Sequence, residues 1–247
     1  MMRGALVLAA MLSTVAPLPA TAIELTPSTV TEWNRYVRRA TSHLHECSGT
    51  CCHGAPDGRA IDIAGGTIHH WRGSTLVRHV TVDQVVNALM NPGTPPPQDD
   101  VLESRVLSRN GNALRIYLKL VRRTIISVVY DTEHDVVFER HSRALATSRS
   151  ISTKIAEEGG ADRGFLWRLN SYWRYSQMGS DVRIDLESIS LSRDVPWFVR
   201  SMAEPLISRI ARESVTRTLS SVRSYLEKRP PGALCAPRVA PAESEVM

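Results

Sequence analysis

Residues 162–196 hold two long runs of alternating residue types separated by a short turn, and this stretch constrains the fold more than any other. In the first run Trp167, Leu169, Ser171, Trp173 and Tyr175 share one face, because side chains alternate between the two sides of a strand. The intervening residues 177–181 contain a glycine, which is typical of a hairpin turn. The stretch therefore predicts a β-hairpin with a strongly aromatic first strand.

The register of this hairpin depends on the position of its turn. A turn centred on Gly179 places Trp167 opposite Leu191 and Ser171 opposite Glu187. In that register the apolar residues of the second strand change face near Glu187. Either a β-bulge at this point or a sheet that is buried on both faces would account for the change.

Other segments rich in β-branched and aromatic residues predict further strands over residues 62–77, 102–108, 113–121, 124–132, 136–143 and 145–155. Asn110-Gly111 marks one tight hairpin turn, and Glu133-His134-Asp135 marks another. Residues 62–77 are expected to be the first strand of the main sheet. With the hairpin, the five segments over residues 102–155 form an antiparallel meander of six or seven strands, which is too continuous for a parallel α/β fold.

Three helical segments surround the predicted strands. Residues 26–46 carry an apolar stripe that includes Trp33 and Val37, and residues 81–90 form a short helix capped by Thr81. After residues 197–203 and a break at Pro205, residues 207–228 form one amphipathic helix, long enough to cross a sheet. The predicted fold class is therefore α+β.

The N-terminus has the pattern of a secretory signal. Arg3 precedes an apolar run over residues 5–15, and small residues follow at 20–22, so residues 1–22 are predicted to be a signal peptide. A membrane anchor is the weaker alternative, because the run is about half the ~20 residues that span a bilayer. The predicted localisation is secreted or periplasmic. The predicted divisions are an N-terminal helix and Cys-rich segment (23–60), a main domain (61–229) and a disordered tail (230–247).

Four cysteines bear on the chemistry of an exported chain. Cys47, Cys51 and Cys52 lie close together, and Cys235 lies far away in the tail. An even number of cysteines favours disulfides outside the cytoplasm. Because histidines flank the cluster, a metal or redox site and free thiols stay open as alternatives, but the spacing matches no closed zinc pattern. The sequence therefore assigns no metal ion and no cofactor.

The net charge of +5 comes from 27 Arg and 3 Lys, which are spread along the chain without blocks. Nucleic-acid binders more often concentrate basic residues on one helix or stripe, so no nucleic-acid partner is expected. The charge does allow a weak, transient attraction to an anionic membrane surface.

The order of the predicted elements resembles the helix-grip fold of the START-like (SRPBCC) superfamily. The segments GTIHHWRGSTLV, VLESRVLSRNGN, FLWRLNSYWRY and IDLESISLSRDVP are similar to those of an uncharacterised group of bacterial exported proteins in that superfamily. The resemblance spans residues 66–229. It implies a curved antiparallel sheet of about seven strands wrapped on the long C-terminal helix, with a cavity between them. The superfamily includes lipid-transfer domains, coenzyme Q-binding proteins and polyketide cyclases, whereas the group itself implies no established activity.

Such a cavity would be mainly apolar, with a few polar groups that orient a ligand. The aromatic wall candidates are Trp71, Phe138, Trp167, Trp173 and Tyr175. Ser171, Glu187, Arg168 and Arg174 are the polar candidates. The alternative for each aromatic residue is simple core packing, and for Glu187 it is a structural ion pair with an arginine.

Two functions compete on this pattern. The leading hypothesis is an exported carrier that binds a lipid or other apolar small molecule. The alternative is a cyclase-like or hydrolase-like enzyme that uses Glu187 or His70 as a general acid or base. The sequence has no Gly-x-Ser-x-Gly elbow, paired-His zinc helix or phosphate-binding loop, which favours the carrier.

Overall fold

A computed structural model describes residues 25–42, 56–91, 100–123, 127–160, 166–193 and 197–228. The predictions for the signal peptide (1–22), for Cys47, Cys51, Cys52 and Cys235, and for the tail (230–247) lie outside the described residues. In chain order the elements are α1 (Pro27–Ser42), β1 (Asp57–Ile63), β2 (Gly66–Val77), α2 (Val82–Met90), β3 (Val101–Asn110), β4 (Ala113–Arg123), β5 (Ser127–Ser142), β6 (Leu145–Glu157), β7 (Arg168–Met178), β8 (Asp181–Arg193) and α3 (Trp197–Glu227).

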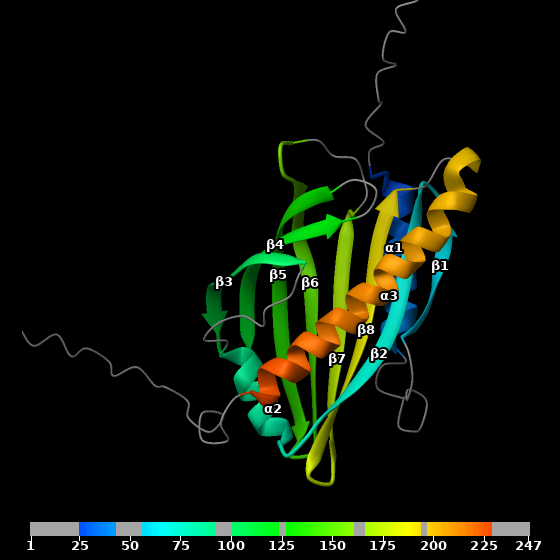
Figure 1. The fold of residues 1–247 in the computed structure, drawn as a ribbon. Helices are drawn as coiled ribbons and strands as arrows, with labels where there is room; N and C mark the ends of the chain where they lie inside the picture. Colours follow the sequence, from blue (N-terminus) through cyan, green and yellow to red (C-terminus); the bar gives the residue numbers. More distant parts are fainter. Residues whose placement is uncertain are drawn as a thin grey trace, which may run out of the picture.

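The strands form one antiparallel sheet in the order β1-β2-β8-β7-β6-β5-β4-β3 (Figure 1). The predicted α+β fold, a curved sheet with a long C-terminal helix and an extra N-terminal helix, is confirmed. The sheet has eight strands instead of about seven. The additional strand is β1, an edge strand whose residues are largely exposed, so that it lacks the apolar alternation from which strands are predicted.

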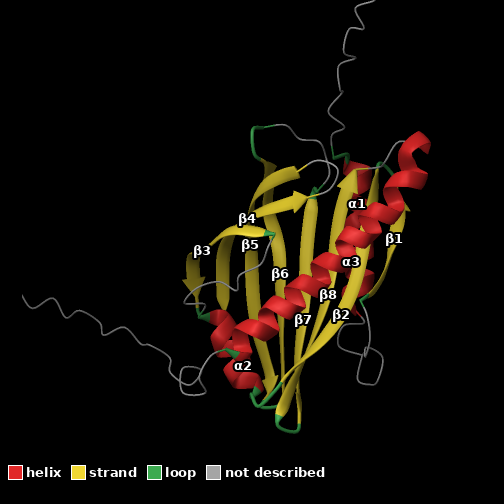
Figure 2. Cartoon of the chain, viewed as in Figure 1, coloured by secondary structure: helices red, strands yellow, loops and turns green. Residues whose placement is uncertain are grey.

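The two longer helices lie on opposite faces of the sheet (Figure 2). The helix α3 crosses the face that we call the inner face, where Val215, Leu219 and Val222 join the largest buried cluster. A Cβ on Gly73 of β2 would lie 2.9 Å from side-chain carbons of both Val215 and Leu219, so glycine permits this close approach. The helix α1 covers the other face, the outer face, at the β1-β2-β8 side.

The hairpin β7–β8 forms as predicted, but its register is shifted by one residue. Gly179 and Ser180 form a two-residue turn, with Gly179 at φ 63°, and Met178 pairs with Asp181. As a result Ser171 pairs with Ser188 and Tyr172 pairs with Glu187. The shift matters because a slip of one residue moves a side chain to the other face of the sheet.

The corrected register explains the apolar pattern of β8 without a bulge. Ile184 and Leu186 pack in the inner cluster, whereas Ile189 and Leu191 pack in the outer cluster beneath α1. Of the two explanations considered for the sequence pattern, the sheet buried on both faces is therefore the one observed.

Two predicted chain breaks are wrong. The polar triplet Glu133-His134-Asp135 lies within the continuous strand β5, where a register shift against β6 at Glu133 and His134 absorbs the irregularity. The helix α3 runs through Pro205 without interruption. A proline removes one hydrogen bond and can kink a helix without ending it.

Candidate ligand-binding cavity

A cavity of about 270 Å³ lies on the inner face of the sheet, between strands β3–β8, the end of α2 and the C-terminal half of α3. Most of its wall is apolar. The described residues that line it are Leu89, Asp100, Val101, Ser104, Val106, Leu114, Ile116, Leu118, Leu120, His134, Val136, Phe138, Ser148, Ser150, Leu169, Ser171, Trp173, Tyr175, Leu186, Ser188, Ser214, Val215, Thr218 and Tyr225.

Small polar side chains form the floor of this cavity. Ser150 of β6 pairs with Ser171 of β7, which pairs with Ser188 of β8, so that three serines stand side by side across the sheet. Val136 continues this row on one side and Trp71 on the other. Because a serine side chain is short, the row leaves space beneath α3 where larger residues would fill the core.

His134 stands beside this row and is only 2% exposed. Its Nε2 lies 3.1 Å from Thr132 Oγ1, and its Nδ1 lies 3.3 Å from Ser150 Oγ. Burial lowers the pKa of His134 from 6.5 to about 4, and the nearby Asp135 carboxylate opposes this only in part. The imidazole is therefore neutral at physiological pH.

The edge strand β3 borders the opening of the cavity. Val106 lines the cavity and is nevertheless 41% exposed, so the cavity reaches the surface along this strand. Leu102 and Leu107 are also exposed, and both lie at the two register shifts of β3 against β4. The cavity opening is therefore apolar at Val106, and β3 exposes two further apolar side chains.

Four of the residues predicted for the site lie in the wall of the cavity: Phe138, Ser171, Trp173 and Tyr175. Tyr175 is fully buried, which raises the pKa of its hydroxyl, and its oxygen lies 2.9 Å from Ser148 Oγ. Trp71 also lies on the inner face, but it packs in the core beneath α3, with the Arg212 guanidinium 5.4 Å from its ring.

The structure places the other predicted site residues, Trp167, Arg168, Arg174 and Glu187, away from the cavity. Trp167 belongs to the cluster beneath α1. Arg168, Arg174 and Glu187 lie on the outer face, because their cross-strand partners are Leu191, Asp185 and Tyr172. For Glu187 the one-residue register shift is the reason, since the expected pairing puts Glu187 on the same face as Ser171. Arg168 and Arg174 alternate with Trp173 and Tyr175 along β7 and so face outward in either register.

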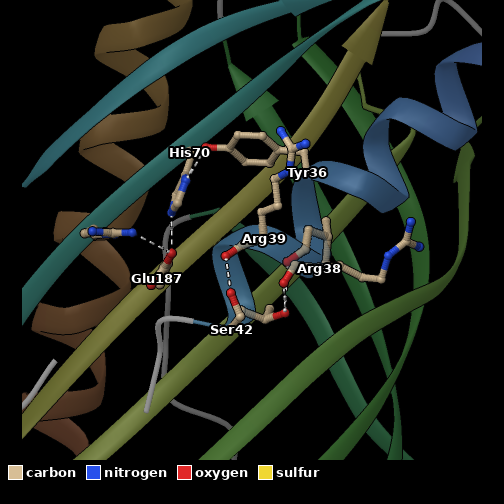
Figure 3. A network of polar contacts seen from close by, with 9 residues as sticks. Tyr36, Arg38, Arg39, Ser42, His70 and Glu187 are labelled. Atoms are coloured by element: carbon tan, nitrogen blue, oxygen red, sulfur yellow. Dashed lines mark hydrogen bonds and ion pairs between the residues drawn. The ribbon is translucent and has the colours of Figure 1, made fainter. Parts of the chain in front are cut away.

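Glu187 instead anchors a polar network beneath α1 (Figure 3). Its Oε1 lies 2.5 Å from His70 Nε2 and 3.1 Å from Arg72 Nη2. On the other side of the imidazole, the hydroxyl of Tyr36 from α1 lies 2.6 Å from His70 Nδ1. Both residues named for the enzyme alternative, Glu187 and His70, thus lie in a link between α1 and the sheet.

The sequence interpretation missed the serine row and His134. The sequence interpretation puts His134 in a predicted turn, as the middle residue of Glu133-His134-Asp135. The inward serines alternate with larger residues in SRSIS and ESISLS. This period-two spacing indicates a strand face of small polar side chains and was the signal that could have revealed the serine row. No cluster of three metal-ligating side chains occurs among the described residues. Within the same ranges, no helix is long and apolar enough to cross a membrane.

No protein-family model matches the chain, and no curated protein matches it. Among solved structures, human STARD10 aligns with a TM-score of 0.50 at 11% identity, over 78% of this chain and 79% of that one. A STAR-related lipid transfer protein from Xanthomonas axonopodis aligns at 0.48, with 17% identity over 69% of this chain and 99% of that one. The Zhui aromatase/cyclase from Streptomyces sp. R1128 aligns at 0.44, with 14% identity over 66% and 95%. The likeness to STARD10 shows the helix-grip fold that the resemblance implied.

Proposed function

We infer that this protein is an exported carrier that holds a small apolar molecule in the cavity between the sheet and α3. The observation that carries this proposal is a space of about 270 Å³ with a largely apolar wall. A dry apolar cavity of about 150 Å³ is enough to admit benzene. The space in this domain therefore suits a molecule of one or two rings, or one acyl chain, better than a whole two-chain lipid.

Burial of apolar surface supplies the affinity in such a site. Each Å² removed from water contributes about 25 cal/mol, and the wall offers side chains such as Phe138, Trp173 and Leu186 as partners. The cyclase-like or hydrolase-like alternative is less well supported, because Glu187 and His70 lie on the outer face and do not reach the cavity.

Replacing Ser171 by leucine tests the carrier function directly. Ser171 stands in the middle of the cavity floor, so the larger leucine side chain is expected to fill the space. The amount of apolar compound bound per chain should fall several-fold. Cavity filling commonly leaves stability unchanged or raises it. Native mass spectrometry of the purified protein, followed by organic extraction, measures the amount of compound retained per chain.

Ser176→Leu is the matched control, because Ser176 lies on the same strand but on the outer face, beside Arg174. We expect this variant to retain as much compound as the wild type. Equal retention by Ser171→Leu and the wild type would contradict a cavity in this position. Failure of the wild type to retain any apolar compound or to bind an added one would contradict the carrier function.

Export is part of the proposal and rests on residues 1–22. The mature chain is expected to begin at Ile23, and its four cysteines to form two disulfides. N-terminal sequencing of protein recovered from the periplasm or the medium, with thiol titration in the absence of reductant, checks both. An intact Met1 or a full set of free thiols would contradict this part of the proposal.

A further inference from the structure

The polar groups of the cavity floor define which ligand chemistry fits. Ser150, Ser171 and Ser188 present their hydroxyls side by side into the cavity. Ser150 contacts His134, whereas within the described part of the chain the hydroxyls of Ser171 and Ser188 have no protein hydrogen-bond partner. Buried or half-buried hydroxyls are usually paired, so these two are available to a ligand.

The hydrogen-bond network assigns the tautomer of His134. The Thr132 hydroxyl donates its proton to the Leu118 carbonyl, at 2.9 Å, so its oxygen is left to accept from His134 Nε2–H. His134 Nδ1 then carries no proton and accepts from the Ser150 hydroxyl. This leaves the Ser150 oxygen as an acceptor facing the cavity, next to two hydroxyls that can both donate and accept.

The charge of the wall excludes one class of ligand. The described residues that line the cavity include Asp100 but no lysine or arginine, and His134 is neutral. An anionic head group would therefore be buried without a countercharge from the described lining residues, which is costly. An uncharged hydroxyl, in contrast, can donate to the Ser150 oxygen and accept from Ser171 or Ser188.

We propose that the ligand is an uncharged, mainly apolar molecule that bears a hydroxyl group, and that the serine row on β6, β7 and β8 binds this group. The inference rests on the proposed carrier function and narrows its ligand class. It distinguishes a phenol or an alcohol from the matching hydrocarbon and from the matching acid.

Three probes of the same size and shape test the proposal: 2-naphthol, naphthalene and 2-naphthoate, each titrated into the full mature chain at pH 7.5 by calorimetry. One or two neutral hydrogen bonds correspond to about a tenfold gain, so 2-naphthol is expected to bind about tenfold more tightly than naphthalene. 2-Naphthoate is expected to bind more weakly than either.

The double variant Ser171→Ala/Ser188→Ala removes the two available hydroxyls and adds no bulk. It is expected to lower the preference for 2-naphthol over naphthalene several-fold, because only the hydrogen bond to the Ser150 oxygen is left, and to leave naphthalene binding unchanged. Ser176→Ala, on the outer face, is the control and should keep the wild-type preference.

The outcomes separate the two proposals. If naphthalene and 2-naphthol bind equally, if 2-naphthoate binds best, or if the double variant keeps the wild-type preference for 2-naphthol, the proposed ligand class is overturned while the carrier function stands. If none of the three probes binds, both proposals are overturned.

Discussion

Replacing Glu187 by alanine is expected to lower the free energy of unfolding by about 3 kcal/mol, near the lower end of values for breaking a buried ion pair. The side chains of Glu187 and His70 are only 10% and 7% exposed. Without the carboxylate, His70 Nε2 is left buried with no acceptor, while Arg72, at 46% exposed, can turn to water. Urea denaturation at neutral pH measures the change.

Glu133→Ala is the matched control for this substitution. Glu133 also contacts two basic side chains, at 3.0 Å from Arg115 and 3.6 Å from Lys154, but both partners are about half exposed. Exposed pairs of this kind contribute about 0–1 kcal/mol, so this variant should remain close to the wild type.

The same Glu187 variant also separates a structural role from a role in ligand binding. Because Glu187 lies on the outer face, the folded variant should still bind 2-naphthol as the wild type does. If the variant instead kept the stability of the wild type and lost 2-naphthol binding, Glu187 would have a role in ligand binding.

The protein is expected to lose stability steeply as the pH falls from about 6.5 to about 4. Burial lowers the pKa of both His69 and His134 from 6.5 to about 4 in the folded chain, and Asp62 and Asp135 respectively oppose this only in part. In this interval the unfolded chain binds the protons and the folded chain does not, so stability is present above pH 6.5 and is lost toward pH 4.

Each histidine accounts for about 3 kcal/mol of this loss, since one pH unit corresponds to about 1.36 kcal/mol. Two such groups approach the whole stability of an ordinary domain, which is about 5–15 kcal/mol. Urea denaturation at pH 7.5 and pH 4.5 should therefore show a large difference for the wild type.

The double variant His69→Gln/His134→Gln is expected to show a much smaller difference between the two pH values, because glutamine does not titrate. The carboxylates titrate alike in both proteins and cancel in the comparison. An equal loss of stability in the variant and the wild type would mean that other groups cause the acid sensitivity.

The sequence predicts the fold well where local signals agree with the tertiary structure. The Thr81 cap is one case: its hydroxyl accepts from the Gln84 backbone N–H, and the Gln84 side chain accepts from the Thr81 backbone N–H. The aromatic face of β7 is another, since Trp173 and Tyr175 both face inward as the alternation requires.

The wrong face assigned to Glu187 has one physical cause. Pairing across the hairpin depends on whether the turn has two residues or is centred on one, and Gly179 is compatible with both. A difference of one residue left Trp173 and Tyr175 on the correct face but assigned Glu187 to the wrong one. The serine row was missed because it exists only across strands, between Ser150, Ser171 and Ser188, and no single segment displays it.

The burial of β8 on both of its faces has a further consequence. None of its residues is exposed, and Glu187, beneath α1, is joined directly to Ser188 in the cavity floor. A backbone displacement at either residue therefore moves the other. A molecule that binds under α3 and displaces Ser188 would consequently also displace Glu187 and strain the contact between α1 and the sheet. Amino-acid substitutions should accordingly be tolerated best in strands such as β3, whose residues are mostly exposed to solvent. In β8 they should be tolerated poorly at every position, whereas a strand with one exposed face tolerates them at every second position.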